Sequence, residues 1–201
     1  YCIEALMGDK RALQAGTSHN LGQNFAKAFD VTFQTKDNKE ELVYATSWGI
    51  STRLVGAVIM THGDDKGLRL PPKIAPFQVV VVPIFRDEEN MVAVKNYLSP
   101  ILSTLRDGGI RVHEDWRKES PGFKFNEWEM KGVPLRLEVG PKDVENGKAV
   151  LVRRDSGEKL FVQKDEVGEI VPKLLEDIQK TLFNEAKDFR EKNTHRVSSY
   201  D

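Results

Sequence analysis

The stretch FQVVVVPIF, residues 77–85, decides the fold of the larger part of this chain. Four consecutive valines and an isoleucine make it a β-branched run, and no charged residue interrupts it. Such a run is typical of a strand that is buried on both faces, because β-branched side chains pack well on a pleated surface. The stretch therefore predicts a fully buried strand.

The chain that follows this strand alternates between helix and strand patterns. Apolar residues with a helical period predict helices at 91–105, 120–132 and 167–182. Strands are predicted at 110–116 and 133–139, and KAVLVRRDSGEKLFVQK (148–164) predicts a hairpin. Together these patterns predict the α/β (α+β) fold class, with a mixed sheet of about five strands.

The chain that precedes the strand is predicted to form smaller elements. They are a hairpin over 2–16 that turns at Gly8-Asp9, a helix over 18–29 that Ser18 or Asn20 caps, strands over 31–35 and 42–48, and a helix over 53–61. The last helix is apolar nearly all round, which predicts burial on every face. The proline-rich LRLPPKIAP (68–76) predicts a stiff connection and a domain boundary.

Composition excludes several classes of protein. The 201 residues carry a formal net charge of −1, so the chain is not a polycation that binds nucleic acid by charge alone. One cysteine, Cys2, excludes a disulfide framework and a multi-cysteine zinc site within these residues. No apolar run reaches the roughly 18 residues of a membrane span, so we expect a cytoplasmic protein. Both ends of the sequence look cut, so we expect a piece of a longer protein.

The stretch SWGISTRLVGAVIMTHGDD (47–65) has two ends with different chemistry. The ending, His62-Gly63-Asp64-Asp65, offers metal ligands, but we favour a helix end in which Gly63 is left-handed and the aspartates face solvent. No metal site is therefore predicted. At the beginning, Arg53 lies at a helix N-terminus, where its planar cation suits a phosphate or a base. The alternative is a surface arginine paired with an acid.

Neutral hydrogen-bonding residues gather in the preceding part of the chain. They are Gln14, Thr17, Ser18, His19 and Asn20. Such a group beside apolar strands suits the recognition of a small polar ligand. The alternative for His19 is a satisfied core histidine.

Four segments of the chain carry a family resemblance. They are GDKRALQAGTSHNLGQNFAKAFD (8–30), SWGISTRLVGAVIMTHGDDKGLRLPPKIAP (47–76), SPGFKFNEWEMKGVPLRLEVGPKD (120–143) and VRRDSGEK (152–159). Taken in order, they resemble the prolyl-tRNA synthetase family in its archaeal and eukaryote-like form. The resemblance implies a class II enzyme with an antiparallel catalytic sheet and an α/β anticodon-binding domain. Such an enzyme activates L-proline with ATP and Mg²⁺ and transfers it to tRNA(Pro).

The resemblance implies a role for each matching position. Arg53 takes the place of the motif 3 arginine, the catalytic residue that clamps ATP and offsets the charge of the triphosphate. The other implied contacts are Gln14 and Thr17 with ATP, and His19, Trp48, Gly49 and Ser51 with proline. The alternative for Trp48 is core packing. No residue is needed as an acid or base, because adenylate formation is an in-line attack of the proline carboxylate on the α-phosphate.

The resemblance also implies a division of the chain. Residues 1–75 would be the C-terminal part of the catalytic domain, 76–183 the anticodon-binding domain and 184–201 the start of a further domain. In the family, the dimer-forming motif and the motif 2 arginine lie upstream and a zinc-binding domain lies downstream. We therefore expect a homodimer of the full-length protein, no zinc site within this chain, and no ATP–pyrophosphate exchange by this chain alone.

Charge does not mark an RNA surface in the second half. Residues 106–164 hold 13 Lys and Arg against 11 Asp and Glu, so binding has to be local. The candidates for anticodon binding are Arg117, Lys124, Arg136, Glu138, Lys142 and Arg153, with Lys118 and Arg154 beside them and Phe123, Phe125 and Trp128 as stacking partners. The alternative is a solvated face over core aromatics. We hypothesise that Glu138 and Arg136 read a guanine.

Two other functions are compatible with parts of the pattern. One is a non-catalytic tRNA-binding or regulatory relative that uses the anticodon-binding domain. The other is a sister synthetase for threonine, histidine or glycine, against which GTSHNLGQNF (16–25) argues. Neither function implies DNA as a partner.

Overall fold

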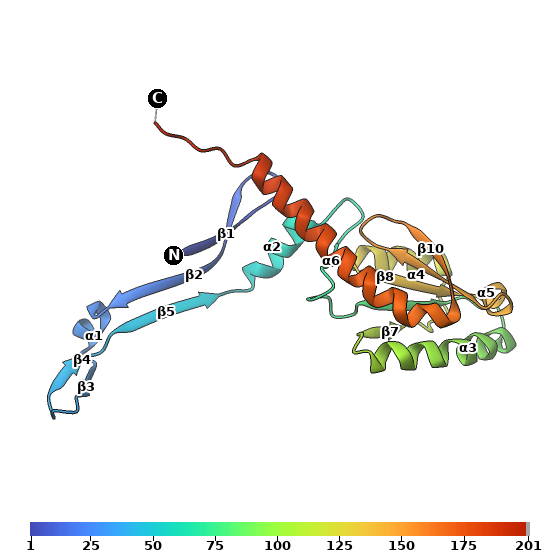
Figure 1. Ribbon diagram of the computed structural model, residues 1–201, viewed down its shortest axis with the longest axis horizontal. Helices are drawn as coiled ribbons and strands as arrows, with labels where there is room; N and C mark the ends of the chain where they lie inside the picture. The colour runs from blue at the N-terminus through green and yellow to red at the C-terminus, as the bar shows by residue number, and fades with distance from the viewer. Residues whose placement is uncertain (200–201) are drawn as a thin grey trace. The chain divides into compact units, whose positions relative to one another are not determined.

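The computed structural model describes residues 1–199 and divides into two compact units (Figure 1). Unit 1 is Tyr1–Thr61 and unit 2 begins at His62. The functional division predicted at 75/76 and 183/184 stays a prediction.

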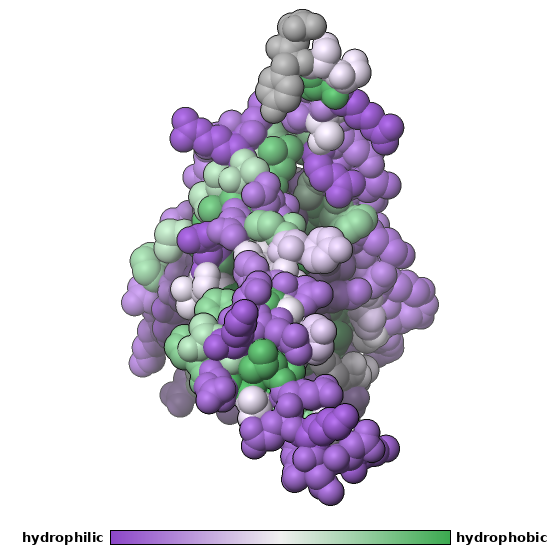
Figure 2. Space-filling model, turned by 90° about the vertical axis from the view of Figure 1, so that its left-hand side faces the viewer, coloured by the Kyte–Doolittle hydropathy of each residue, from purple (hydrophilic) through white to green (hydrophobic). Residues whose placement is uncertain are grey.

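Unit 1 is built on an antiparallel sheet with the strand order β1-β2-β5. Its elements are β1 (Cys2–Leu6), β2 (Ala12–Gly22), α1 (Asn24–Phe29), β3 (Thr32–Gln34), β4 (Glu40–Leu42), β5 (Ala45–Ile50) and α2 (Arg53–His62), which ends at the first residue of unit 2. The hairpin predicted around Gly8-Asp9 is confirmed, because β1 pairs with β2. Apolar side chains of unit 1, among them Phe29, Tyr44 and Trp48, are exposed. Figure 2 shows apolar side chains at the surface among polar ones.

The helix predicted over residues 18–29 is wrong in its first half. Ser18 and His19 belong to β2, where they pair with Trp48 and Ser47 of β5. Cross-strand pairing overrides the helical spacing there, and Asn20 accepts a hydrogen bond from the backbone of Gly22 instead of capping a helix. Helix α1 begins only after Gln23, which makes no side-chain cap.

The prediction that the helix over 53–61 is buried on every face is also wrong. Ala57 is buried, whereas Val55, Ile59 and Met60 are exposed. Apolar residues on every face of a helix show which side chains could be buried, but unit 1 buries only some of the side chains of α2.

The end of α2 also differs from the prediction. Gly63 is not among the glycines of residues 1–199 that have a left-handed backbone. Asp64 does not simply face solvent, because Arg154 donates to both of its carboxylate oxygens, at 2.6 and 2.9 Å. Asp64 is therefore a structural ion-pair partner of Arg154.

Unit 2 is a sheet between helices. Its elements are β6 (Val79–Pro83), α3 (Glu88–Asp107), β7 (Val112–Glu114), α4 (Pro121–Met130), β8 (Leu135–Val139), α5 (Pro141–Glu145), β9 (Lys148–Arg153), β10 (Lys159–Gln163), η1 (Lys164–Glu166) and α6 (Val167–Lys192). The strand order is β10-β9-β8-β6-β7, with β6 parallel to both of its neighbours and the β8–β9 and β9–β10 pairs antiparallel. The predicted mixed sheet of five strands is confirmed.

Strand β6 lies at the centre of the packing. Val79, Val80, Val81 and Val82 are each 0 % exposed. Val79 and Val81 pack in the large core with α3 and α6, whereas Val80 and Val82 pack with Trp128 of α4 on the other face. The β-branched run therefore has one helical layer on each side, as a strand buried on both faces requires.

Side-chain caps lie at the N-termini of α3 and α4, and α3 begins at Glu88, before the start predicted at residue 91. The Asp87 side chain accepts from the backbone N–H of Asn90 at the start of α3. Ser120 accepts from the backbone N–H of Phe123 at the start of α4, and Pro121 occupies its first turn. The short α5 and η1 were not predicted, because five and three residues are too few for an apolar periodicity to be recognised.

Two valines on α3 test the core of unit 2. Val94 is 0 % exposed and Val92 is 49 % exposed. Val94→Ala should lower the free energy of unfolding by about 2 kcal/mol, because it removes two buried methyl groups and leaves a cavity. Val92→Ala should change it by about 0.5 kcal/mol or less. Equal shifts in the urea midpoints of the two variants would contradict this packing.

The Asp64–Arg154 ion pair should make stability depend on pH. Hydrogen bonds from Arg154 lower the pKa of Asp64 from 3.8 to about 2. Because the folded pKa is depressed, the stabilisation is present above pH 3.8 and is lost as the pH falls through about 2. Asp64→Asn should therefore destabilise the chain at pH 7 and make little difference at pH 2, as measured by urea unfolding.

Asp65→Asn is the matched control, because the neighbouring Asp65 is exposed. It should leave stability unchanged at both pH values. A loss as large as that of Asp64→Asn would mean that general charge, and not the Arg154 pair, is responsible.

Candidate functional site

One face of the β1–β2 pair gathers the residues predicted to contact ATP. Gln14 lies opposite Glu4, and Thr17 lies opposite Cys2, which is two residues before Glu4 in β1. Regular alternation would place positions 14 and 17 on opposite faces of β2. A register shift of the β-bulge type at Ala15 returns them to the same face.

Arg53 reaches this face from the first residue of α2. Its Nη1 donates to Gln14 Oε1 at 3.2 Å and lies 3.5 Å from the carbonyl oxygen of Gln14. The backbone N–H of Arg53 donates to the hydroxyl of Ser51 at 3.3 Å. The structure therefore brings Arg53 and Gln14 into direct contact, with the arginine side chain at the surface of unit 1.

The residues predicted to contact proline are divided between two faces. On β5, Gly49 pairs with Thr17 and Ser47 pairs with His19, so His19 shares the face of Thr17. Trp48 lies between these two positions and points to the opposite face, where it is 77 % exposed. The structure places His19 beside the ATP residues and separates Trp48 from them.

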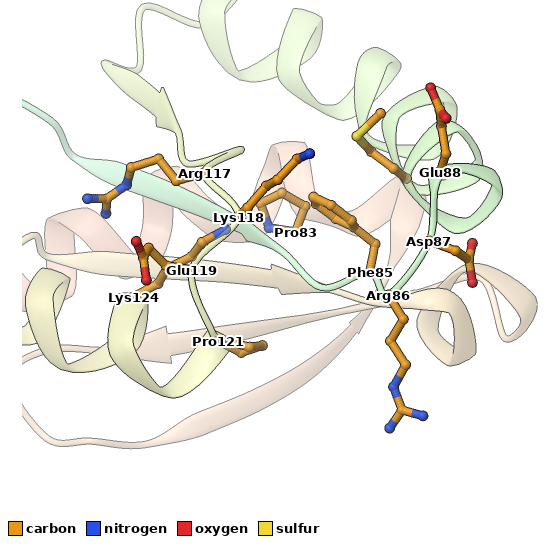
Figure 3. Close-up of a pocket in the computed structure, with 11 residues that line it drawn as sticks. Pro83, Phe85, Arg86, Asp87, Glu88, Arg117, Lys118, Glu119, Pro121 and Lys124 are labelled. Carbon is orange, nitrogen blue, oxygen red and sulfur yellow. The ribbon is translucent and has the colours of Figure 1, made fainter.

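A cavity of about 390 Å³ lies at the carboxyl ends of β6 and β7, and we call it the strand-end cavity (Figure 3). The chain leaves β6 for α3 on one face of the sheet and leaves β7 for α4 on the other face. Neighbouring parallel strands whose connections part in this way form the crevice in which open α/β sheets bind ligands. Topology therefore makes this cavity a candidate binding site.

The strand-end cavity has an aromatic wall and charges of both signs. Phe85 lies with its ring centroid 6.0 Å from that of Trp116. The charged residues that line the cavity are Arg86, Asp87, Glu88, Arg117, Lys118, Glu119 and Lys124. The Lys124 side chain runs from α4 toward the middle of the group, whereas the guanidinium groups of Arg86 and Arg117 extend outward (Figure 3).

Lys124 is the most unusual of these charges. It is 2 % exposed, and its Nζ donates to the backbone oxygen of Asp115 at 2.9 Å. The same Nζ lies 5.9 Å from the centroid of the Phe85 ring. Burial lowers the pKa of Lys124, while the Asp115 carboxylate opposes that shift.

Arg136 and Arg153 line a second, smaller cavity of about 180 Å³, which we call the β8–β9 groove. Arg136 Nε donates to Glu138 at 2.7 Å, and its guanidinium lies 4.3 Å from the centroid of the Phe125 ring. Arg153 pairs with Asp155 and Asp177. Both arginines are therefore paired with acids.

The six residues predicted to bind the anticodon therefore do not form one site. Arg117 and Lys124 line the strand-end cavity, Arg136 and Arg153 line the β8–β9 groove, Glu138 is buried beside Arg136, and Lys142 is exposed on α5. Opposite charges at alternate positions of one strand predict a pair, so the sequence already contained the signal for Arg136–Glu138. Within residues 1–199, no three His, Cys, Asp or Glu side chains lie close enough to hold a metal ion. No helix in that range combines the length and apolar character needed to cross a bilayer.

Comparison with known proteins identifies both units. A family model described as an anticodon binding domain matches residues 78–174, a range that contains the strand-end cavity. The proline–tRNA ligase of Natranaerobius thermophilus is 55 % identical over 202 residues, which cover 100 % of this chain and 41 % of that protein. The proline–tRNA ligases of Symbiobacterium thermophilum and Salinibacter ruber are each 54 % identical and cover 97 % and 100 % of this chain and 40 % and 41 % of their own lengths.

The chain belongs to the proline–tRNA ligase family. The resemblance found in four segments of the sequence is thereby confirmed. The chain spans about two fifths of the length of these proline–tRNA ligases, and the similarity to them extends through both units.

Several residues of the strand-end cavity were not predicted. They are Pro83, Phe85, Arg86, Asp87, Glu88, Met91, Glu119 and Pro121. A signal was present, because residues that directly follow a buried parallel strand lie at the binding edge of a sheet. What was missing was the sheet order, which brings the end of β7 to the end of β6.

Proposed function

We propose that this chain serves a proline–tRNA ligase at two places. In unit 1, the face that carries Gln14, Thr17 and Arg53 contributes to the site for ATP and proline. In unit 2, the strand-end cavity receives an anticodon base of tRNA(Pro). The observation that supports the second assignment best is the combination of Phe85 with donors and acceptors in a cavity at a topological switch point.

The contents of the strand-end cavity suit a nucleobase better than a bare phosphate. Single-stranded RNA is read by stacking bases on aromatic rings and by hydrogen bonds to base edges. A guanine edge both accepts and donates, so it needs a cation such as Lys124 and an acid such as Glu88 or Glu119. A site for phosphate alone would have cations without the three acids.

Adenylation of proline requires positioning more than proton transfer. The proline carboxylate attacks the α-phosphorus of Mg²⁺-bound ATP, and the bond from that phosphorus to the bridging oxygen of pyrophosphate breaks. We assign charge neutralisation on ATP to Arg53, and hydrogen bonds to the nucleotide to Gln14 and Thr17. His19, Gly49 and Ser51 are assigned to the side of proline. Trp48 is left out, because it lies on the opposite face of β5.

The whole enzyme is proposed to be a cytoplasmic homodimer with tRNA(Pro), L-proline and ATP as its partners. The names of the relatives favour catalysis over the non-catalytic tRNA-binding alternative.

Phe85→Ala tests the strand-end cavity. It should weaken binding of an anticodon stem–loop of tRNA(Pro) roughly 5- to 150-fold, because base–aromatic stacking contributes about 1–3 kcal/mol per base. The measurement is a titration of the labelled stem–loop at constant salt.

Phe161→Ala is the control for this titration, since Phe161 is an exposed phenylalanine on β10 that does not line the strand-end cavity. It should bind as tightly as the unaltered protein. Unchanged affinity for Phe85→Ala, or an equal loss for both variants, would refute the assignment.

Arg53→Ala tests the ATP assignment in the whole ligase. Losing one preorganised donor to the triphosphate should lower the rate of proline-dependent ATP–pyrophosphate exchange about 100-fold or more. Arg11→Ala, at an exposed arginine in the β1–β2 turn, should leave the rate unchanged. Exchange at the normal rate without Arg53 would remove this residue from the mechanism.

A further inference from the structure

Asp115 is a buried acid that is bonded to two residues of the strand-end cavity, Arg117 and Lys124. It follows the last residue of β7 and is 1 % exposed. Its backbone N–H donates to the carbonyl oxygen of Val81 at 2.9 Å, which ties it to the central strand β6. A buried carboxylate without partners would be costly, so its contacts need an explanation.

Two residues from different segments satisfy this carboxylate. Arg117 donates from Nε to Oδ1 at 2.8 Å and from Nη2 to Oδ2 at 2.7 Å, and its backbone N–H also donates to Oδ1. Trp128 of α4 donates from Nε1 to Oδ2 at 2.7 Å. These bonds hold the pKa of Asp115 well below its usual range, so the group stays charged.

The same residue also fixes Lys124. The backbone oxygen of Asp115 accepts from Lys124 Nζ, and Oδ1 lies 4.0 Å from that ammonium. Asp115 therefore orders two of the cations that line the strand-end cavity. Arg117 is held on its outer side by Glu127, at 2.6 Å.

We propose that Asp115 is a positioning residue for anticodon recognition, which keeps Lys124 charged and aimed at the base and holds Arg117 at the rim of the strand-end cavity. This inference rests on the proposed function of that cavity. Asp115 itself need not touch the RNA. Its effect is to preorganise the donors, so that binding does not have to order two long side chains.

The pH dependence of RNA binding separates this role from a purely structural one. Lys124 binds the base as a cation, so affinity should fall as the pH rises through the pKa of Lys124, which burial has lowered. Asp115→Asn removes the opposing negative charge and should move this midpoint to lower pH. The other charged groups that face Lys124 are Arg117, Lys118 and Glu119 from the segment after β7, and Arg86, Asp87 and Glu88 from the segment after β6.

The experiment titrates the anticodon stem–loop against the chain between about pH 6 and pH 10, with Asp115→Asn, Lys124→Met and Phe85→Ala as variants. The same RNA is used with the unaltered chain and with the three variants, so differences between the four pH series come from the protein. Lys124→Met should abolish the protein-dependent step, and the unaltered chain should show it at higher pH than Asp115→Asn. Tryptophan fluorescence checks that each variant is folded.

The outcomes distinguish the inference from the function on which it rests. If Phe85→Ala weakens binding but folded Asp115→Asn keeps the original midpoint, the positioning role is overturned and the anticodon assignment stands. If Phe85→Ala has no effect, both fail. If Asp115→Asn does not fold, Lys124→Met decides, because a pH step that survives without Lys124 overturns the inference.

Discussion

The complete burial of β6 is the constraint on which the second unit depends. A strand with four valines out of water needs apolar cover on both faces, and the chain supplies α3 and α6 on one face and α4 on the other. The connections after β6 and β7 must therefore depart in opposite directions. Their departure opens the strand-end cavity, so the packing of four valines creates the place where a ligand can bind.

The buried acid Asp115 positions charged side chains of this cavity. Asp115 lies one residue past β7, and its backbone is bonded to β6, so the position of the acid follows from the sheet. Arg117 and Lys124 then take their positions from Asp115. Arg117 is also paired with Glu127, just as Arg136 and Arg153 of the β8–β9 groove are paired with acids. Lys124 differs from these arginines, because its Nζ donates to a backbone oxygen and lies 4.0 Å from Asp115 Oδ1.

A bulge has the corresponding role in unit 1. Without the register shift at Ala15, Gln14 and Thr17 would face opposite sides of β2. With it, Gln14 meets Arg53 from α2, and His19 follows on the same face. Short strands and one exposed helix therefore assemble a polar face without a large core beneath it.

Sequence patterns alone determined the family, the buried strand, the order of the strands and of the longer helices in unit 2 and the candidate Arg53, because periodicity and motifs are local properties of the chain. They also pointed to Arg117 and Lys124. Only the tertiary structure decided that β2 extends through Ser18 and His19, that Arg136 binds Glu138, and that Phe85 meets Lys124 beside Asp115. These relations depend on strand pairing and register between distant segments, which no local pattern specifies.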